Sequence, residues 1–314
     1  MQPSKDLTQT VNTQVKLGPL TLKNPVITAS GTYGFGEEYA ELCPVEALGG
    51  ITLKGITPEP RLGNPVPRLA ETPSGLLNSV GLENPGLDEF IASYLPKVRE
   101  LPTAAIANIS GFSVADYVTM ARAFQKGSGL AALEVNISCP NVKHGGMAFG
   151  TDPASAEQVI AAVKAETDLP VIAKLSPNVT SIVEMAKAAV RGGADIISLI
   201  NTLLGMSIDI EKQSPVLANT VGGLSGPAVR PVAVRMVWEV SQAVNVPIIG
   251  MGGILTWQDA VEFLLAGASA VSIGTGNFVD PCAPLEVLKG IKAYCRCHGI
   301  SEVSGLTGLA WKKR

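Results

Sequence analysis

The chain has 314 residues, of which 46% are hydrophobic and only 5% are aromatic, and its formal net charge is −3. No block of lysine and arginine occurs, so nothing in the sequence indicates nucleic-acid binding. Residues 1–14 are polar, no run of 18 apolar residues could span a membrane, and the five cysteines lack zinc-site spacing. We therefore expect a cytoplasmic protein with no bound metal.

The chain begins with a short hairpin and two strands. Residues 15–17 and 20–22 flank Gly18-Pro19, which predicts a hairpin that could plug one end of a barrel. Residues 25–30 and 50–55 are apolar runs that end in Ser30 and in Lys54-Gly55. Both patterns predict buried strands, with a helix near residues 37–47 between them.

Residues 56–84 interrupt this alternation. The segment contains five prolines and shows no helical period. We expect a structureless insertion, and insertions of this length in compact domains are usually functional. A helix is expected to follow at residues 85–100.

From there strands and helices alternate regularly. Further strands are predicted at residues 104–108, 131–136, 171–175, 196–201, 247–250 and 270–274. The helices between them are marked by Ser113, Asp152 and Thr256 as N-caps, and others are expected at residues 180–191, 227–243 and 283–298. Residues 205–225 form a second long insertion.

Eight βα units in a row favour a closed barrel over an open sheet. At roughly 250 residues plus insertions, such a barrel also fits the length of the chain. We therefore predict an α/β fold, a TIM (β/α)8 barrel with an N-terminal hairpin and insertions after strands 2 and 6. No linker divides the sequence, so residues 1–314 are interpreted as one domain.

Polar side chains follow most of the predicted strands. In a parallel barrel the carboxyl ends of all strands meet at one face, where active sites lie. The strand ends in chain order are Ser30, Lys54, Asn108, Asn136 with Cys139, Lys174, Asn201-Thr202, Gly252-Gly253, and Gly274-Thr275. Buried lysines are costly unless they are paired or functional, so core packing does not explain this set.

The last two strand ends, and Gly226 in a third glycine-rich turn, predict a phosphate site, because glycine lets backbone N–H groups approach an anion closely. A phosphate beside several amides and lysines indicates a phosphorylated planar cofactor across the barrel mouth. Lys174 would face its ring, where a cation stabilises the negative charge of a reduced flavin. The thiol of Cys139, just past a strand end, is a candidate proton acceptor once it is ionised.

Four motifs resemble those of class 1 dihydroorotate dehydrogenases. They are Asn136-Ile137-Ser138-Cys139-Pro140-Asn141, Asn78-Ser79-Val80-Gly81-Leu82, Ser30-Gly31-Thr32 and Leu224-Ser225-Gly226-Pro227. Val142-Lys143-His144-Gly145-Gly146 is more similar to the 1B catalytic subunit than to the fumarate-using 1A form. The membrane-bound class 2 enzymes carry serine in place of Cys139 and an N-terminal helical extension.

The resemblance implies specific roles for these residues. FMN would contact Ser30, Lys54, Gly55, Asn108, Asn136, Lys174, Ile200, Gly226, Gly252, Gly253, Gly274 and Thr275. Dihydroorotate would contact Lys54, Asn78, Ser79, Val80, Gly81, Leu82, Asn136, Asn201 and Thr202. Cys139 would remove the proton from C5 while a hydride leaves C6 for the flavin, with Lys174 as the second catalytic residue. Apart from the resemblance, Gly145, Gly146 and Gly150 as possible hinges and the low apolar content of residues 143–151 predict a mobile lid over the substrate.

A 1B enzyme would also need a second protein. The resemblance implies an electron-transfer subunit that carries FAD and a [2Fe–2S] cluster, in a heterotetramer of two catalytic and two electron-transfer subunits. This chain has no four-cysteine pattern for such a cluster, which fits a division of labour between the subunits.

Other functions remain open from the residues. A flavin barrel of another family could reduce a different pyrimidine, as dihydropyrimidine dehydrogenase does, although Lys54 beside Asn78 suits a substrate carboxylate. The 1A form would use fumarate instead of NAD+. An aldolase or isomerase barrel that binds a sugar phosphate would need no flavin, and a barrel that only binds a partner would show no turnover.

Overall fold

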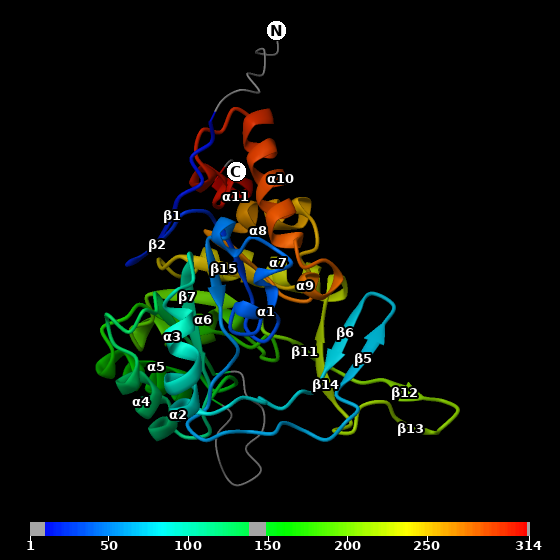
Figure 1. The fold of residues 1–314 in the computed structure, drawn as a ribbon. Coiled ribbons are helices and arrows are strands. Elements are labelled where there is room, and N and C mark those ends of the chain that lie inside the picture. Colours follow the sequence, from blue (N-terminus) through cyan, green and yellow to red (C-terminus); the bar gives the residue numbers. More distant parts are fainter. Residues whose placement is uncertain (1–9, 138–148, 313–314) are drawn as a thin grey trace.

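Eight parallel strands form a closed barrel in the computed structural model, which describes residues 10–137 and 149–312 (Figure 1). The strands are β3 (Val26–Thr28), β4 (Gly50–Thr52), β7 (Ala104–Ile109), β8 (Ala132–Asn136), β9 (Val171–Lys174), β10 (Ile196–Leu199), β15 (Ile248–Met251) and β16 (Ala270–Ile273). They follow one another around the barrel in chain order, and β16 closes it against β3. The predicted TIM barrel is confirmed, and each predicted barrel strand is present within three residues at either end.

The N-terminal hairpin closes one end of the barrel. It consists of β1 (Val15–Leu17) and β2 (Leu20–Leu22), paired antiparallel. Its apolar side chains form one buried cluster with inward-facing residues of the barrel strands, among them Ile27, Ile106 and Ile172. The predicted plug is confirmed, and the polar carboxyl ends of the strands lie at the opposite end.

Helices surround the barrel and cover the outer faces of its strands (Figure 1). The longer ones are α4 (Val114–Ala123), α5 (Pro153–Glu166), α6 (Ile182–Arg191), α7 (Arg230–Ser241), α8 (Trp257–Ala266) and α10 (Ala283–Cys297). Ser113, Asp152 and Thr256 cap α4, α5 and α8, as the sequence predicts, because each side chain accepts a hydrogen bond from a free backbone N–H of the first turn. Helix α6 begins two residues later than expected, with Ser181 as its cap.

Shorter elements complete the outer layer. They are α1 (Glu37–Ala40), a 3-10 turn at Val45–Ala47, α2 (Leu87–Glu89), a π turn at Phe90–Tyr94, α3 (Leu95–Val98), a 3-10 turn at Pro227–Val229, α9 (Gly276–Val279), a 3-10 turn at Val303–Leu306 and α11 (Leu309–Lys312). The helix predicted over residues 37–47 is therefore two separate turns. Among the residues described, no helix is long and apolar enough to cross a bilayer.

The two insertions form a second sheet. The prediction that residues 56–84 are structureless is therefore wrong. Strands β5 (Leu69–Thr72) and β6 (Gly75–Asn78) make a hairpin, and β6 pairs antiparallel with β14 (Gly222–Ser225), which pairs with β11 (Leu203–Gly205). Figure 1 shows these strands side by side at one edge of the barrel mouth, with β12 (Ile208–Asp209) and β13 (Ser214–Pro215) projecting beyond them. The short strands carry little alternation, so only their pairing reveals them.

Candidate active site

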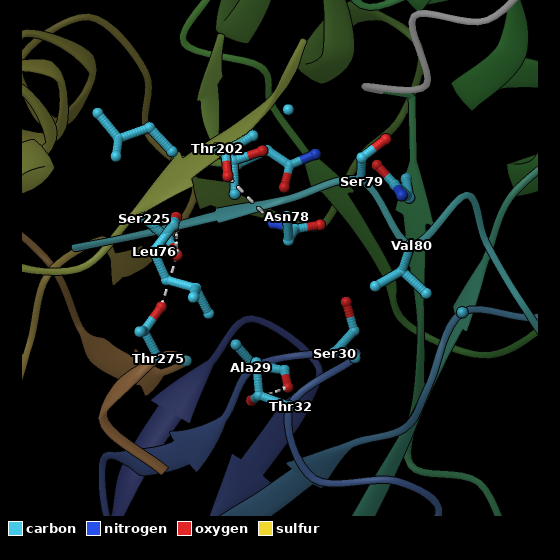
Figure 2. A pocket seen from close by; sticks show the side chains of 18 of the residues that line it. Ala29, Ser30, Thr32, Leu76, Asn78, Ser79, Val80, Thr202, Ser225 and Thr275 are labelled. Atoms are coloured by element: carbon cyan, nitrogen blue, oxygen red, sulfur yellow. Dashed lines mark hydrogen bonds between the residues drawn. The ribbon is translucent and has the colours of Figure 1, made fainter. Parts of the chain in front are cut away.

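A cavity of about 690 Å³ opens at the carboxyl ends of the barrel strands, below the second sheet. That volume lies in the upper part of the range for ligand pockets and suits a cofactor together with a small substrate. Figure 2 shows Ser30, Asn78, Thr202, Ser225 and Thr275 on different sides of this space. Side chains from far apart in the sequence therefore meet around one cavity.

The structure brings together the predicted site residues that it describes. The lining includes Ser30, Lys54, Gly55, Asn108, Asn136, Lys174, Ile200, Gly226, Gly252, Gly253, Gly274, Thr275, Asn78, Ser79, Val80, Gly81, Leu82, Asn201 and Thr202. Cys139 and residues 143–148 of the predicted lid lie outside the described residues. The roles assigned to each residue remain predictions.

A polar layer lies inside the barrel directly below the cavity. Side chains alternate along a strand, so Asn108 and Lys174 share the inward face of Ile106 and Ile172, two residues earlier. The Lys174 Nζ atom donates to Ser30 Oγ at 3.2 Å and lies 3.7 Å from Glu134 Oε1. Lys174 is only 5% exposed, so its ammonium group is held in the wall of the cavity with a buried carboxylate behind it.

Asn136 at the end of β8 is fixed from two sides. Its Nδ2 atom donates to Ser110 Oγ at 3.1 Å, and its carbonyl oxygen accepts a hydrogen bond from the hydroxyl of buried Tyr117 at 2.8 Å. The Tyr117 ring also packs edge-on against Phe149, with 6.1 Å between the ring centres. The barrel and α4 thus hold the strand end that precedes Cys139.

The second sheet forms one wall of the cavity. Asn78 at the end of β6 donates from Nδ2 to the carbonyl oxygen of Gly223 at 3.2 Å, which joins the two insertions. Asn64 Nδ2 donates to the carbonyl oxygen and to the Oγ of Ser79, both at 3.1 Å. These bonds hold residues 78–82 in place over the cavity.

Three glycine-rich turns meet at the phosphate site predicted from the sequence. Gly226, Gly252 and Gly253 have φ values of 92°, 126° and 78°, a region that favours glycine. A Cβ atom on Gly253 would lie 2.7 Å from the carbonyl oxygen of Gly226. Thr275 donates from its hydroxyl to Ser225 Oγ at 2.7 Å, which ties the turn after β16 to β14 (Figure 2). The two turns at Gly226 and Gly253 are therefore packed too closely for a side chain at Gly253.

Several lining residues were not predicted from the sequence. Arg61 stacks over the Phe112 ring, with its guanidinium carbon 4.7 Å from the ring centre, and both line the cavity. Asn178 donates to Ser176 Oγ and to the carbonyl oxygen of Thr202, at 3.3 and 3.0 Å. Asn178 follows the strand that ends at Lys174, and this position in the sequence could have identified it as a residue of the cavity. Arg61 carries no comparable signal because it lies in the irregular insertion.

Charge around the cavity is predominantly positive. Lys54, Arg61 and Lys174 line it, whereas Glu83 is the acidic residue among the described lining, and that carboxylate pairs with Arg68. A cationic pocket with hydrogen-bonding amides suits anionic, planar ligands. Among the described residues, no cluster of three or more His, Cys, Asp and Glu side chains could hold a metal ion.

Comparison with known proteins gives the same family as the sequence motifs. The family model described as "Dihydroorotate dehydrogenase" matches residues 12–294. This span includes the barrel strands, the second sheet and the lining residues described above.

Curated relatives are similar over nearly their full length. A protein of Desulforamulus reducens, named "Dihydroorotate dehydrogenase B (NAD(+)), catalytic subunit", is 56% identical over 96% of this chain and 99% of its own. Proteins with the same name from Alkaliphilus metalliredigens and Bacteroides thetaiotaomicron are 54% and 52% identical, over 95% and 94% of this chain and 98% and 97% of their own.

Proposed function

The chain belongs to the dihydroorotate dehydrogenase family, and from this premise we propose that it is the catalytic subunit of an NAD+-linked enzyme. It oxidises (S)-dihydroorotate to orotate in pyrimidine biosynthesis. The observation that carries this proposal is the cationic, amide-lined cavity at the barrel mouth, in a chain 52–56% identical to relatives of that name.

The flavin of this enzyme is FMN. Gly226, Gly252 and Gly253 have positive φ values and line the cavity without side chains, which supports a phosphate site at their backbone. The sequence has no GxGxxG fingerprint for a second nucleotide, which supports FMN rather than FAD. Thr275 adds a hydroxyl beside the phosphate site, and Lys174, Asn108 and Ser30 would hold the ring. When bound, the flavin supplies the hydride acceptor.

Dihydroorotate would bind beside the flavin, against the wall of the cavity that the second sheet forms. Lys54 and the amides of Asn78, Asn136 and Asn201 supply a cation and hydrogen-bonding groups for its carboxylate and its ring. Residues 79–82 and Thr202 shape the rest of the site. Cys139 would take the proton from C5 of the substrate, and Lys174 would stabilise the negative charge of a reduced flavin.

Electrons leave the site through another protein. The relatives are named as catalytic subunits, which supports a partner electron-transfer subunit. We propose that this partner carries FAD and a [2Fe–2S] cluster, that two copies of each subunit assemble, and that the complex is cytoplasmic.

Identification of the released cofactor tests the proposal. The purified chain should be yellow, and acid or heat should release FMN, identified by chromatography against FMN and FAD standards. Anaerobic addition of dihydroorotate should bleach the flavin absorbance, whereas dihydrouracil, which lacks the carboxylate, should not. Release of FAD, absence of flavin, or bleaching by dihydrouracil alone would contradict the proposal.

A further inference from the structure

A carboxylate, that of Glu134, is buried inside the barrel below the cavity. Glu134 lies in the middle of β8, is 2% exposed, and faces the barrel interior between the apolar plug and the polar mouth. It is absent from the lining of the cavity, so a ligand there does not touch it. Burial of a charge in an apolar barrel costs stability unless partners compensate it.

Glu134 has three partners, one on each of the barrel strands β7, β9 and β10. Oε1 accepts from Asn108 Nδ2 at 2.8 Å and lies 3.7 Å from Lys174 Nζ, while Oε2 accepts from Ser198 Oγ at 2.9 Å. Asn108 and Lys174 line the cavity, and Ser198 does not. The carboxylate therefore contacts two lining residues from the side that faces away from the ligand.

This arrangement fixes which atom Asn108 presents to the cavity. An ionised carboxylate only accepts hydrogen bonds, so the amide must turn its NH2 group toward Glu134. The Asn108 Oδ1 atom then lies against Gly55, 2.9 Å from where a Cβ on that glycine would be, and both residues line the cavity. Asn108 is thereby held with Oδ1 free to accept a hydrogen bond from a ligand in the cavity.

The same carboxylate acts on Lys174. It lies behind the ammonium group, and Ser30 Oγ accepts from that group on another side. A buried cation next to a fixed anion keeps one position because any displacement separates the charges in a medium of low dielectric constant.

We infer that Glu134 is a positioning residue for the cofactor ring: it orients Asn108 as a hydrogen-bond acceptor and holds Lys174 in the wall of the cavity. This inference rests on the proposed function, since FMN is the ring in question. The oxidised flavin ring has one N–H group, at N3, and Asn108 Oδ1 would accept a hydrogen bond from that group when FMN is bound.

The test compares FMN binding to apoprotein variants by quenching of flavin fluorescence. The substitution Glu134→Gln keeps the shape but removes the charge, and its amide can face Asn108 in either orientation. We expect FMN to bind about 10- to 100-fold more weakly, the size of a lost charge-assisted hydrogen bond. Wild-type protein should prefer FMN to N3-methyl-FMN, and Glu134→Gln should lose most of that preference.

A second variant tests the inference even if Glu134→Gln does not fold. Ser198 contacts Glu134 but not the cavity, so Ser198→Ala can affect FMN only through the carboxylate. We expect binding about 3- to 10-fold weaker, with a reduced preference over N3-methyl-FMN. The matched control is Asp195→Asn, which removes a half-buried carboxylate bonded to Lys164 and to the backbone of Val171, at the opposite end of β9.

The outcomes separate the two claims. If wild-type apoprotein binds FMN but Ser198→Ala and Glu134→Gln keep its affinity and preference, the positioning role is wrong while the proposed function stands. If a variant instead has a lower melting temperature, and a lower affinity for FMN and for N3-methyl-FMN by the same factor, the preference for FMN is unchanged. Glu134 is then only structural, and the inference is overturned. If wild-type apoprotein does not bind FMN, both claims fail.

Discussion

Burial makes two cysteines of this chain, Cys43 and Cys295, harder to ionise. Cys43 and Cys295 are 1% and 0% exposed, and burial raises the pKa of Cys43 to about 12 and that of Cys295 to about 11. For Cys43, a hydrogen bond with Cys282 contributes as well. Thiols held protonated in this way are structural, unlike the base proposed at Cys139.

The buried thiols make stability depend on pH in alkaline solution. The pKa of Cys295 is higher in the folded chain than its ordinary value of about 9, so the unfolded state loses its proton first. The free energy of unfolding should therefore fall as the pH rises from about 9 to about 11. Urea unfolding at several pH values in this range should show that the free energy of unfolding falls less steeply with pH in Cys295→Ala than in the wild type. The same pH dependence in both proteins would contradict the role of this thiol.

Replacement of Cys139 should separate catalysis from cofactor binding. We expect Cys139→Ala to retain FMN but to turn over about 10²- to 10⁴-fold more slowly, the usual contribution of a general base. Cys139→Ser should keep some activity with a higher pH optimum, because a hydroxyl ionises less readily than a thiol. Steady-state assays with an artificial dye measure this.

Cys297→Ala is the matched control, since Cys297 is a half-exposed thiol at the end of α10, and it should leave the rate unchanged. Near wild-type turnover of Cys139→Ala at neutral pH would show that another group is the base.

At the scale of elements, turns rather than strands would carry the proposed phosphate site. The turn after β15 is held against the turn before α7 so closely that only glycine fits at Gly253. The barrel strands supply rigid ends, and the backbone of the turns supplies donors whose direction is set by positive φ values.

The substitution Gly253→Ala should weaken FMN binding by about tenfold or more. The new Cβ would collide with the carbonyl oxygen of Gly226, so the turn would have to shift. The shift would remove contacts with the phosphate and lower the binding free energy of FMN by ~1–2 kcal/mol or more. Isothermal titration of apoprotein with FMN measures the change. Gly127→Ala is the matched control, because Gly127 has a φ of 91° but nothing within 4 Å of its added Cβ. Equal FMN affinity for both variants would place the phosphate elsewhere.

For the whole molecule, a cavity of about 690 Å³ opens at the barrel mouth, and the sequence contains no GxGxxG dinucleotide-binding fingerprint. FMN and dihydroorotate would together fill that cavity. An electron carrier must then approach from outside, which agrees with relatives that are named as subunits.

The isolated chain should therefore oxidise dihydroorotate with an artificial dye but reduce NAD+ poorly. Co-expression with a protein that carries FAD and an iron–sulfur cluster should restore NAD+ reduction, followed at 340 nm, a standard wavelength for NADH. Rapid electron transfer from the isolated chain to fumarate would instead support a 1A-type enzyme.

Local signals in the sequence are sufficient for the barrel and for most of its polar strand ends. Apolar runs ending in Asn108, Asn136 or Lys174 indicate both a buried strand and a side chain at the mouth, since the ends of parallel strands meet at one face. Caps such as Ser113 and Thr256 mark helix starts because their bonds span only three residues. These features depend on neighbours along the chain.

Only the tertiary structure reveals the second sheet and the partners of Glu134. Asn78 bonds to Gly223, 145 residues away, and Glu134 bonds to Asn108 and Ser198, 26 and 64 residues away. The period-2 spacing from Glu134 to Asn136 indicates a shared face, but not which groups on β7, β9 and β10 lie opposite. Those partners are set by the register of the closed barrel, which depends on the packing of all its strands together.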